Sequence, residues 1–306
     1  MTGQRQLTGS LIVFSFVFFL NSAFASAMDL RVQDNTVYMS GPVVGHECAE
    51  LKKILDTRWI RWVVLSNSPG GHANTGYCVG ELIRARYVNT SINGNCESSC
   101  SRMWLGGVER ILDGRGSFVG LHGNYDPSGN LMPDAPARLR AWLPRFAGVD
   151  VSLMEKWIVL PKNVMMMRFY NDKTEVCNGR FGCEPLPGTT ARTAGLLPDK
   201  VADAGTSKPA SRHDLLKSDF PRSGFASVED WAKLPIPESF LPNYFSYLNS
   251  PSPKALAISL EKQTGAWNTS KDPNVDVISN ALRRCKERAG SDCVLYAVDD
   301  DVVFKP

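Results

Sequence analysis

The chain has 306 residues, of which 43% are hydrophobic and 21% are charged, a balance that excludes an intrinsically disordered, collagen-like or coiled-coil protein. Thirty-four Lys and Arg residues against 31 Asp and Glu residues give a formal net charge of +3, and no basic block is present, so nucleic acid is not an expected partner. Four histidines without metal-ligand spacing argue against a zinc enzyme, and we expect neither a metal nor another cofactor.

The N-terminal segment has the layout of a secretory signal peptide. Arg5 precedes the apolar run Leu11–Leu20, and small residues with Ala-x-Ala cleavage sites follow, after Ala25 or Ala27. The apolar run is about half as long as a membrane-spanning helix, which needs roughly 20 residues. We therefore expect residues 1–27 to be cleaved off and the remaining protein to be periplasmic or secreted, without stable membrane insertion.

All eight cysteines follow this segment, and an even number of cysteines in an exported protein favours disulfides. The short loops Cys177–Cys183 and Cys285–Cys293 are predicted to be closed by local disulfides, and the pairs Cys48–Cys78 and Cys96–Cys100 are what remains. Eight cysteines allow 105 connectivities, so this scheme is based on proximity along the chain. No Cys-x-x-Cys pair is present.

Strands and helices alternate in the first half of the chain, which predicts an α/β architecture with parallel strand pairing. The expected elements are, in chain order, two short strands or a bent one over Leu30–Tyr38, a helix over Glu47–Thr57, a strand over Trp59–Ser66, a helix over Ala73–Arg86, a strand over Tyr87–Ile92, a turn over Gly94–Ser99, a helix over Ser99–Leu105, and short strands over Arg110–Leu112 and Ser117–His122.

The second half has a less regular pattern. The expected elements are a helix over Ala135–Trp142, two helical pieces over Val151–Tyr170, an irregular segment over Trp231–Tyr247, a short helix over Ala255–Gln263, a helix over Val275–Arg288, and a terminal hairpin of Cys293–Ala297 with Val302–Phe304. The three aspartates Asp299–Asp301 are predicted to form the hairpin turn, because they lack the ligand spacing of a calcium loop. We predict a main domain over residues 28–205, a linker over 206–230 and a small disulfide-stapled module over 231–306.

Three segments carry residues suited to acyl transfer. The turn Asn67–Gly71 follows a predicted strand, and its two glycines leave backbone N–H groups unshielded, as an oxyanion hole requires. Ser99 stands at a strand-to-helix corner, where a hydroxyl is exposed and a helix N-terminus favours negative charge. His122 ends a strand beside Gly123. Each segment alone is more simply a turn, a helix cap or a structural histidine, and only their combination favours a site.

The order and spacing of these segments resemble the proteolytic subunit of the Clp protease, within the Clp/crotonase superfamily. Ser99 follows Gly71 by 28 residues and precedes His122 by 23. The resemblance is carried by Leu65–Gly71, Val88–Cys100 and Leu105–His122. It covers residues 60–125 well, reaches weakly back to residue 29 and on to 201, and stops there. It implies an α/β fold, a spiral of β-β-α units. The small C-terminal part lies outside the resemblance, and its expected helix and hairpin make it an α+β module.

The family's Ser-His-Asp triad implies Ser99 as nucleophile and His122 as general base. The implied oxyanion donors are Gly70 or Gly71 together with the N–H of Cys100. The third triad member lies about 50 residues after the histidine, where the match is poor; we choose Asp172, with Glu175 and Asp126 as alternatives. A further departure is that cysteines, Cys96 and Cys100, flank the serine where the family has small or apolar residues.

These observations predict an exported, ATP-independent serine hydrolase, an endopeptidase-like enzyme that cleaves peptides or flexible protein chains, because an exported protein meets neither ATP nor an unfoldase. The alternative is a non-catalytic binding protein of the cell envelope that kept the fold and lost the acid. A crotonase-type acyl hydrolase is disfavoured, because acyl-CoA is not expected outside the cytoplasm. The sequence leaves open whether the protein forms a homo-oligomer.

Overall fold

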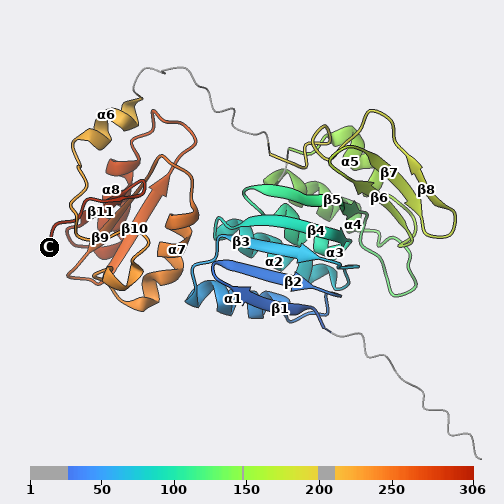
Figure 1. The fold of residues 1–306 in the computed structure, drawn as a ribbon, viewed down its shortest axis with the longest axis horizontal. Coiled ribbons are helices and arrows are strands. Elements are labelled where there is room, and N and C mark those ends of the chain that lie inside the picture. Colours follow the sequence, from blue (N-terminus) through green and yellow to red (C-terminus); the bar gives the residue numbers. More distant parts are fainter. Residues whose placement is uncertain (1–26, 147, 199–210) are drawn as a thin grey trace, which may run out of the picture.

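A computed structural model describes residues 27–146, 148–198 and 211–306 (Figure 1). The predicted signal peptide falls, apart from Ala27, outside the described residues. Within the described ranges, no helix is both long and apolar enough to cross a membrane.

An eight-stranded sheet forms the larger part of the structure. Its strands follow the chain order: β1 (Asp29–Gln33), β2 (Thr36–Ser40), β3 (Trp62–Ser66), β4 (Asn89–Glu97), β5 (Arg110–Leu121), β6 (Met165–Phe169), β7 (Thr174–Asn178) and β8 (Gly182–Pro185). The strands from β2 to β5 pair in parallel, whereas β1 and the strands from β6 to β8 extend the sheet antiparallel. The predicted α/β class is therefore confirmed.

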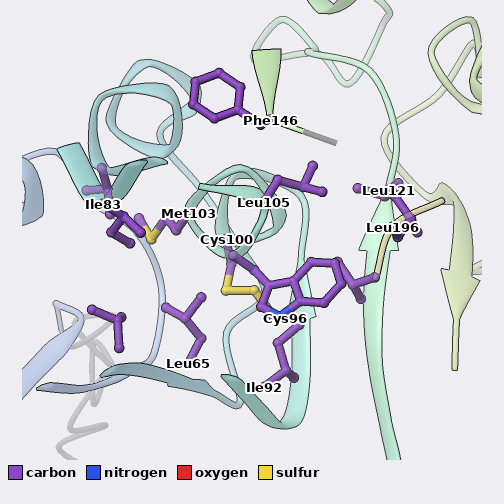
Figure 2. Close-up of a cluster of buried hydrophobic side chains, with 14 of the residues drawn as sticks. Leu65, Ile83, Ile92, Cys96, Cys100, Met103, Leu105, Leu121, Phe146 and Leu196 are labelled. Carbon is purple, nitrogen blue, oxygen red and sulfur yellow. A yellow bond between two sulfur atoms is a disulfide. The ribbon is translucent and has the colours of Figure 1, made fainter. Parts of the chain in front are cut away.

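Helices connect the parallel strands. The helices of this part are α1 (Glu47–Thr57), α2 (Ala73–Ala85), α3 (Ser99–Leu105), α4 (Ala135–Trp142) and α5 (Val151–Trp157), with a 3-10 turn at Leu143–Arg145. The close contact of α2 with α3 depends on glycines, since a Cβ on Gly76 would lie 2.3 Å from the Ser99 carbonyl oxygen and a Cβ on Gly80 2.3 Å from that of Arg102. Helix α3 is thereby buried between α2 and the sheet, among the apolar side chains that Figure 2 shows.

A four-stranded antiparallel sheet organises the C-terminal part. Its strands are β9 (Lys254–Ser259), β10 (Thr264–Thr269), β11 (Val294–Val298) and β12 (Asp301–Val302), in the order β10-β9-β11-β12, and its helices are α6 (Arg212–Ser218), α7 (Leu241–Asn249) and α8 (Val277–Ala289), with 3-10 turns at Trp231–Lys233 and Glu238–Phe240. Asn249 of α7 contacts the segment between α1 and β3, accepting a hydrogen bond from the Trp59 indole (2.9 Å) and donating to the Ile60 carbonyl (2.7 Å).

Two predicted helices are strands in the structure. The second helical piece of Val151–Tyr170 is β6, which pairs with the end of β5. The expected helix over Ala255–Gln263 is mainly β9, whose six residues are all buried. Leu256 and Ile258 face one apolar cluster and Ala255 and Ala257 the other, and a strand covered on both faces has no apolar-polar alternation to distinguish it from a helix.

The predicted linker over residues 206–230 is also partly wrong. Its first residues, 206–210, lie outside the described ranges, but helix α6 follows, and its His213 imidazole lies 2.9 Å from the Asp299 carboxylate in the turn after β11. Ala226 and Val228 are buried in the C-terminal apolar cluster. The few apolar residues of this stretch are therefore used for packing against the second sheet.

The structure joins all eight cysteines in the four predicted pairs, Cys48–Cys78, Cys96–Cys100, Cys177–Cys183 and Cys285–Cys293. The first pair connects α1 to α2, and the second connects the end of β4 to the start of α3.

Candidate active site

A sharp backbone turn at Ser98 separates β4 from α3. Ser98 has φ +56° and ψ −123°, a conformation that costs a residue other than glycine about 1–3 kcal/mol and that clusters at functional sites. Hydrogen bonds hold it on both sides: the Ser98 N–H donates to the Gly120 carbonyl of β5 at 3.0 Å, and the Ser98 carbonyl accepts from the Ser101 N–H at 3.0 Å. The neighbouring strand and the first turn of the helix thus enforce the strained conformation.

The structure places Ser98, and not the predicted Ser99, at the cleft. Ser98 is half-buried and lines a cavity together with His122. Ser99 is 1% exposed and packs against Gly76 of α2. Its hydroxyl faces the protein interior and has no hydrogen-bond partner in the described part of the chain. The prediction is off by one residue because β4 continues to Glu97, so that the corner residue is Ser98.

The Gly-Gly turn lies against this corner. Gly70 has φ +84°, and a Cβ there would lie 2.6 Å from the Ser98 Cβ and 2.9 Å from the Ser99 nitrogen. Its own N–H donates to the Ser68 hydroxyl at 3.3 Å. The N–H groups of Gly71 and Ser99 have no hydrogen-bond partner among the described residues. With Ser98 at the corner, the free N–H that adjoins the serine is that of Ser99, whereas the prediction named Cys100.

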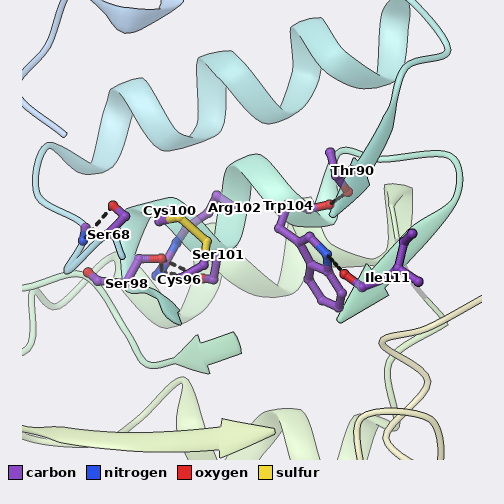
Figure 3. The surroundings of a disulfide bond; sticks show 10 residues. Ser68, Thr90, Cys96, Ser98, Cys100, Ser101, Arg102, Trp104 and Ile111 are labelled. Atoms are coloured by element: carbon purple, nitrogen blue, oxygen red, sulfur yellow. Dashed lines mark hydrogen bonds between the residues drawn. A yellow bond between two sulfur atoms is a disulfide. The ribbon is translucent and has the colours of Figure 1, made fainter. Parts of the chain in front are cut away.

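Figure 3 shows the Cys96–Cys100 disulfide on one side of the corner and the Ser98 hydroxyl on the other, toward the turn that holds Ser68. Both cysteines are completely buried. The disulfide therefore fastens the strand to the helix from within the core and leaves the cleft side of Ser98 open.

His122 follows the end of β5 and is 4% exposed. Its Nδ1 lies 3.2 Å from the Met165 carbonyl oxygen, and because a carbonyl only accepts, Nδ1 carries the proton of the neutral ring and Nε2 is a bare acceptor. Nε2 has no partner within the described residues. Burial, together with the positive charge of Arg102, lowers the pKa of His122 to about 3, so the ring is neutral at physiological pH.

None of the three predicted acids contacts His122. In the antiparallel register of β5 with β6, Leu121 pairs with Met167 and Val119 with Phe169. Phe169, the last residue of β6, is therefore three residues past the position opposite His122, or about 10 Å at roughly 3.3 Å per residue. Asp172 lies further on, in the turn between β6 and β7. The Glu175 carboxylate accepts from Tyr170 (3.1 Å) and Lys173 (2.7 Å).

Asp126 lines the same cavity as His122, but its carboxylate accepts from the Asn130 backbone N–H at 2.9 Å. The predicted triad is thus incomplete, because β6 runs antiparallel to β5 and carries Asp172 away from the histidine.

Sequence reasoning missed Arg102. Its guanidinium is buried beside the corner and donates to the carbonyls of Ser98 and His122. The signal for it was a single charged residue in Ser99–Leu105, a helix that is otherwise apolar or small and buried throughout.

The cavity in front of these groups has a volume of about 630 Å³. Its walls contain the Gly-Gly turn, Ser98, His122 and the loop that follows His122. Its charged lining residues are Glu97, Asp126, Asp134 and Arg138, and Glu97 is paired with Arg168 of β6 at 3.0 Å. The cavity is large enough for several residues of an extended peptide and carries both signs of charge.

One cluster of potential metal ligands lies elsewhere in the described part of the chain, at Glu175, Cys177 and Cys183. Its two sulfur atoms form a disulfide, and metal binding requires free thiolates. The cluster is therefore unsuited to holding a metal ion.

No family model matches this chain, and no curated protein matches it. Similar solved structures include an enoyl-CoA hydratase from Streptomyces coelicolor A3(2), described as putative by its authors, at 12% identity and TM-score 0.33 over 63% of this chain and 70% of that one.

Others are a variant of the membrane-bound stomatin-specific protease 1510-N (13% identity, TM-score 0.36, over 55% of this chain and 79% of that one) and a variant of ClpP1 from Listeria monocytogenes (14% identity, TM-score 0.35, over 53% and 88%). With TM-scores below 0.5, these similarities carry no argument about the fold or the activity of this chain.

Proposed function

We propose that the protein is an exported, ATP-independent serine hydrolase, an endopeptidase-like enzyme that cleaves peptides or flexible protein chains with Ser98 as nucleophile. The observation that carries this proposal is that a strained Ser98, Gly71 with its free N–H and the bare Nε2 of His122 line one cavity, and that the free N–H of Ser99 directly follows Ser98 in the chain. A strained serine next to unpaired backbone donors is the arrangement that acyl transfer needs.

The reaction follows from these groups. The Ser98 Oγ attacks the carbonyl carbon of the scissile amide, and its proton passes to Nε2 of His122. The negative charge on the former carbonyl oxygen is stabilised by the N–H groups of Gly71 and Ser99. Collapse breaks the C–N bond, and the leaving amine takes the proton from His122. Water then attacks the acyl-serine carbonyl and gives a proton to His122. The bond between the Ser98 Oγ and the acyl carbon breaks, and His122 returns the proton to Oγ, which releases the acid and restores Ser98.

The carbonyl of Met165 partly replaces the missing acid. It fixes the ring tautomer with the proton on Nδ1, which is one of the two roles of a triad carboxylate. The second role, stabilisation of the imidazolium, requires a negative charge, and none of the predicted acids supplies it. We therefore expect an active but slow enzyme.

Labelling with a fluorophosphonate probe tests the proposal, because the probe reacts with activated serines. The wild type should be labelled, the Ser98→Ala variant should not be, and the Ser99→Ala variant should retain labelling as the matched control. Loss of labelling in Ser99→Ala with retention in Ser98→Ala would restore the original assignment of Ser99.

The second candidate is a non-catalytic binding protein of the cell envelope. The specific observation in its favour is the low basicity of His122, since an imidazole with a pKa of about 3 is a weak proton acceptor. This candidate predicts that neither the wild type nor any variant is labelled, and that a folded Ser98→Ala protein binds a peptide library as well as the wild type.

Export is supported by the apolar run Leu11–Leu20 and by the four disulfides, which persist in oxidising compartments. Expression of the full chain in a Gram-negative host should give a periplasmic protein whose N-terminus follows Ala25 or Ala27. An uncleaved protein in the cytoplasmic fraction would contradict this part of the proposal.

A further inference from the structure

Arg102 is a buried cation without an anionic partner in the described part of the chain. It is 2% exposed, and its guanidinium donates only to neutral oxygens. These are the carbonyls of Ser98, His122 (2.7 Å) and Gly123 (3.2 Å), the Ser101 hydroxyl (3.2 Å) and Oδ1 of Asn124 (3.2 Å). Burying an unpaired guanidinium is strongly unfavourable, and an apolar side chain would fill the same space without that cost. Packing alone therefore does not explain an arginine at this position.

The contacts of Arg102 connect the two reacting residues through their own backbones. One nitrogen, Nη1, binds the carbonyl of Ser98, and the other, Nη2, binds the carbonyl of His122. These two residues come from different elements, the β4–α3 corner and the end of β5. Because a guanidinium is planar and rigid, its two ends fix the separation of the two carbonyls.

A second layer of hydrogen bonds supports the guanidinium. Asn124 accepts from Arg102 through Oδ1 and donates through Nδ2 to the Tyr77 hydroxyl at 3.0 Å. Tyr77 is itself buried on α2. Arg102 is thus held by α2 and by the loop after β5, so it has a defined place rather than an adaptable one.

We propose that Arg102 is the positioning residue of the site, a buried cation that holds Ser98 and His122 in register through their backbone carbonyls. This inference rests on the proposed function. This arrangement differs from a Ser-His-Asp triad, because Arg102 binds the backbone carbonyls of Ser98 and His122, whereas the acid of a triad binds the imidazole.

The charge of Arg102 has a second consequence, since a cation near His122 disfavours the imidazolium. Other charged or titratable groups line the cavity or contact the ring. They are His72 before α2, Glu97 of β4 with its partner Arg168 of β6, Tyr125 and Asp126 of the following loop, and Asp134 and Arg138 at α4. Removal of Arg102 should therefore raise the pKa of His122, by about one unit if the charges interact across a partly screened interior.

The chain offers a matched control in Arg110. It is 5% exposed and donates only to carbonyls, those of Leu196 (2.7 Å), Gly107 (2.8 Å) and Phe146 (3.0 Å). Arg110 lies far from the cleft. It pairs with Thr90 of β4, whereas the cleft end of β4 is at Glu97, which pairs with Gly120. Seven residues of β4 separate the two positions, or about 23 Å. Arg110→Met should thus lower stability as Arg102→Met does, without an effect on Ser98 or His122.

The experiment compares Arg102→Met, Arg102→Lys and Arg110→Met in the full mature chain. It measures the rate of fluorophosphonate labelling and the His122 pKa by NMR titration of the ring protons. We expect labelling of Arg102→Met to fall by about tenfold to a hundredfold, the range that misplacement of reacting groups produces, with a rise of about one unit in the His122 pKa. Arg110→Met should match the wild type in both readouts.

Arg102→Lys separates charge from geometry and serves where Arg102→Met does not fold. Lysine keeps the positive charge and lacks the planar fork, so the His122 pKa should stay near the wild-type value and labelling should still fall by about tenfold. Wild-type labelling rates in Arg102→Lys, or equal losses in Arg102→Met and Arg110→Met, would overturn the inference.

The NMR readout keeps this inference distinct from the proposed function. Absence of labelling in the wild type would contradict the hydrolase. A His122 pKa that rises in Arg102→Met and not in Arg110→Met would then still support the coupling of Arg102 to His122, and an unchanged pKa would refute it.

Discussion

The depressed pKa of His122 makes a prediction about acid stability. The folded ring has a pKa of about 3, and burial is the first cause, whereas an unfolded histidine has a pKa of about 6.5. Between these two values the unfolded chain binds a proton that the folded chain does not. Acid therefore favours unfolding, and the stability associated with neutral His122 is complete above about pH 6.5 and is lost as the pH falls toward 3.

The size of the effect follows from linkage. One proton taken up on unfolding changes the free energy of unfolding by about 1.4 kcal/mol per pH unit. Integrated from pH 7.5 to 4.5 with pKa values of about 6.5 and 3, the loss is about 2.7 kcal/mol. Other groups titrate in the same range, so the quantity to measure is a difference between two proteins.

The matched variant is His122→Asn, because an asparagine amide can still donate to the Met165 carbonyl and does not titrate. Urea unfolding gives the free energy of unfolding of both proteins at several pH values. Between pH 7.5 and 4.5 the wild type should lose about 2.7 kcal/mol more of this free energy than the variant loses. Parallel curves would show that His122 titrates normally in the folded protein. The low pKa, and with it the buried, carboxylate-free environment of the ring, would then be refuted.

Three further predictions concern the corner, the second sheet and the disulfides. Gly70→Ala should lower the free energy of unfolding, measured in urea, by about 1–3 kcal/mol more than Gly116→Ala does, and it should abolish labelling. Both glycines have φ above +80°, but only a Cβ at Gly70 meets Ser98. Equal losses of stability would contradict the close approach. Leu256→Ala should lower the free energy of unfolding by about 2–5 kcal/mol and Leu260→Ala by less than about 0.5 kcal/mol. The Leu256 side chain is fully buried in β9, whereas that of Leu260 is 44% exposed. A helix over this segment would place both on one face and give similar losses. Thiol titration of the denatured, unreduced protein should find no free thiol, and replacing Cys285 and Cys293 by Ala should cost about 2–3 kcal/mol for the loop they close; two or more free thiols would refute the four pairs.

Local patterns in the sequence were sufficient for much of the main domain. Helices α3 and α4 begin and end at the predicted residues, because their apolar spacing and flanking turns are contained within a few residues. The four disulfides were predicted because each partner lies close along the chain or remains after the local pairs are assigned. The glycines at 70 and 71 were assigned to a turn on the same grounds, and both have positive φ.

The features that failed depend on long-range pairing. Two adjacent serines, Ser98 and Ser99, follow Glu97. Which of them forms the corner depends on how far β4 pairs with β5. Asp172 was chosen by its separation from His122, but its position is set by the direction of β6, whose three methionines and one phenylalanine carry no alternation. Arg102 was missed because the backbone carbonyls that it binds have no sequence signature.

The electrostatics of the site act on the two halves of the proposed acyl transfer in opposite directions. In that reaction the free N–H groups of Gly71 and Ser99, and the positive charge of Arg102, would all stabilise negative charge at Ser98 and its tetrahedral adduct. The same positive charge, in a buried site without a carboxylate, disfavours the imidazolium that must form when His122 accepts the proton. The balance depends on whether bound substrate or its oxyanion, placed beside Nε2, raises the basicity of the ring. A hydrolase therefore requires the His122 pKa to rise by several units when the fluorophosphonate adduct forms at Ser98, and an NMR titration of the adduct that still gave a pKa near 3 would favour the binding protein.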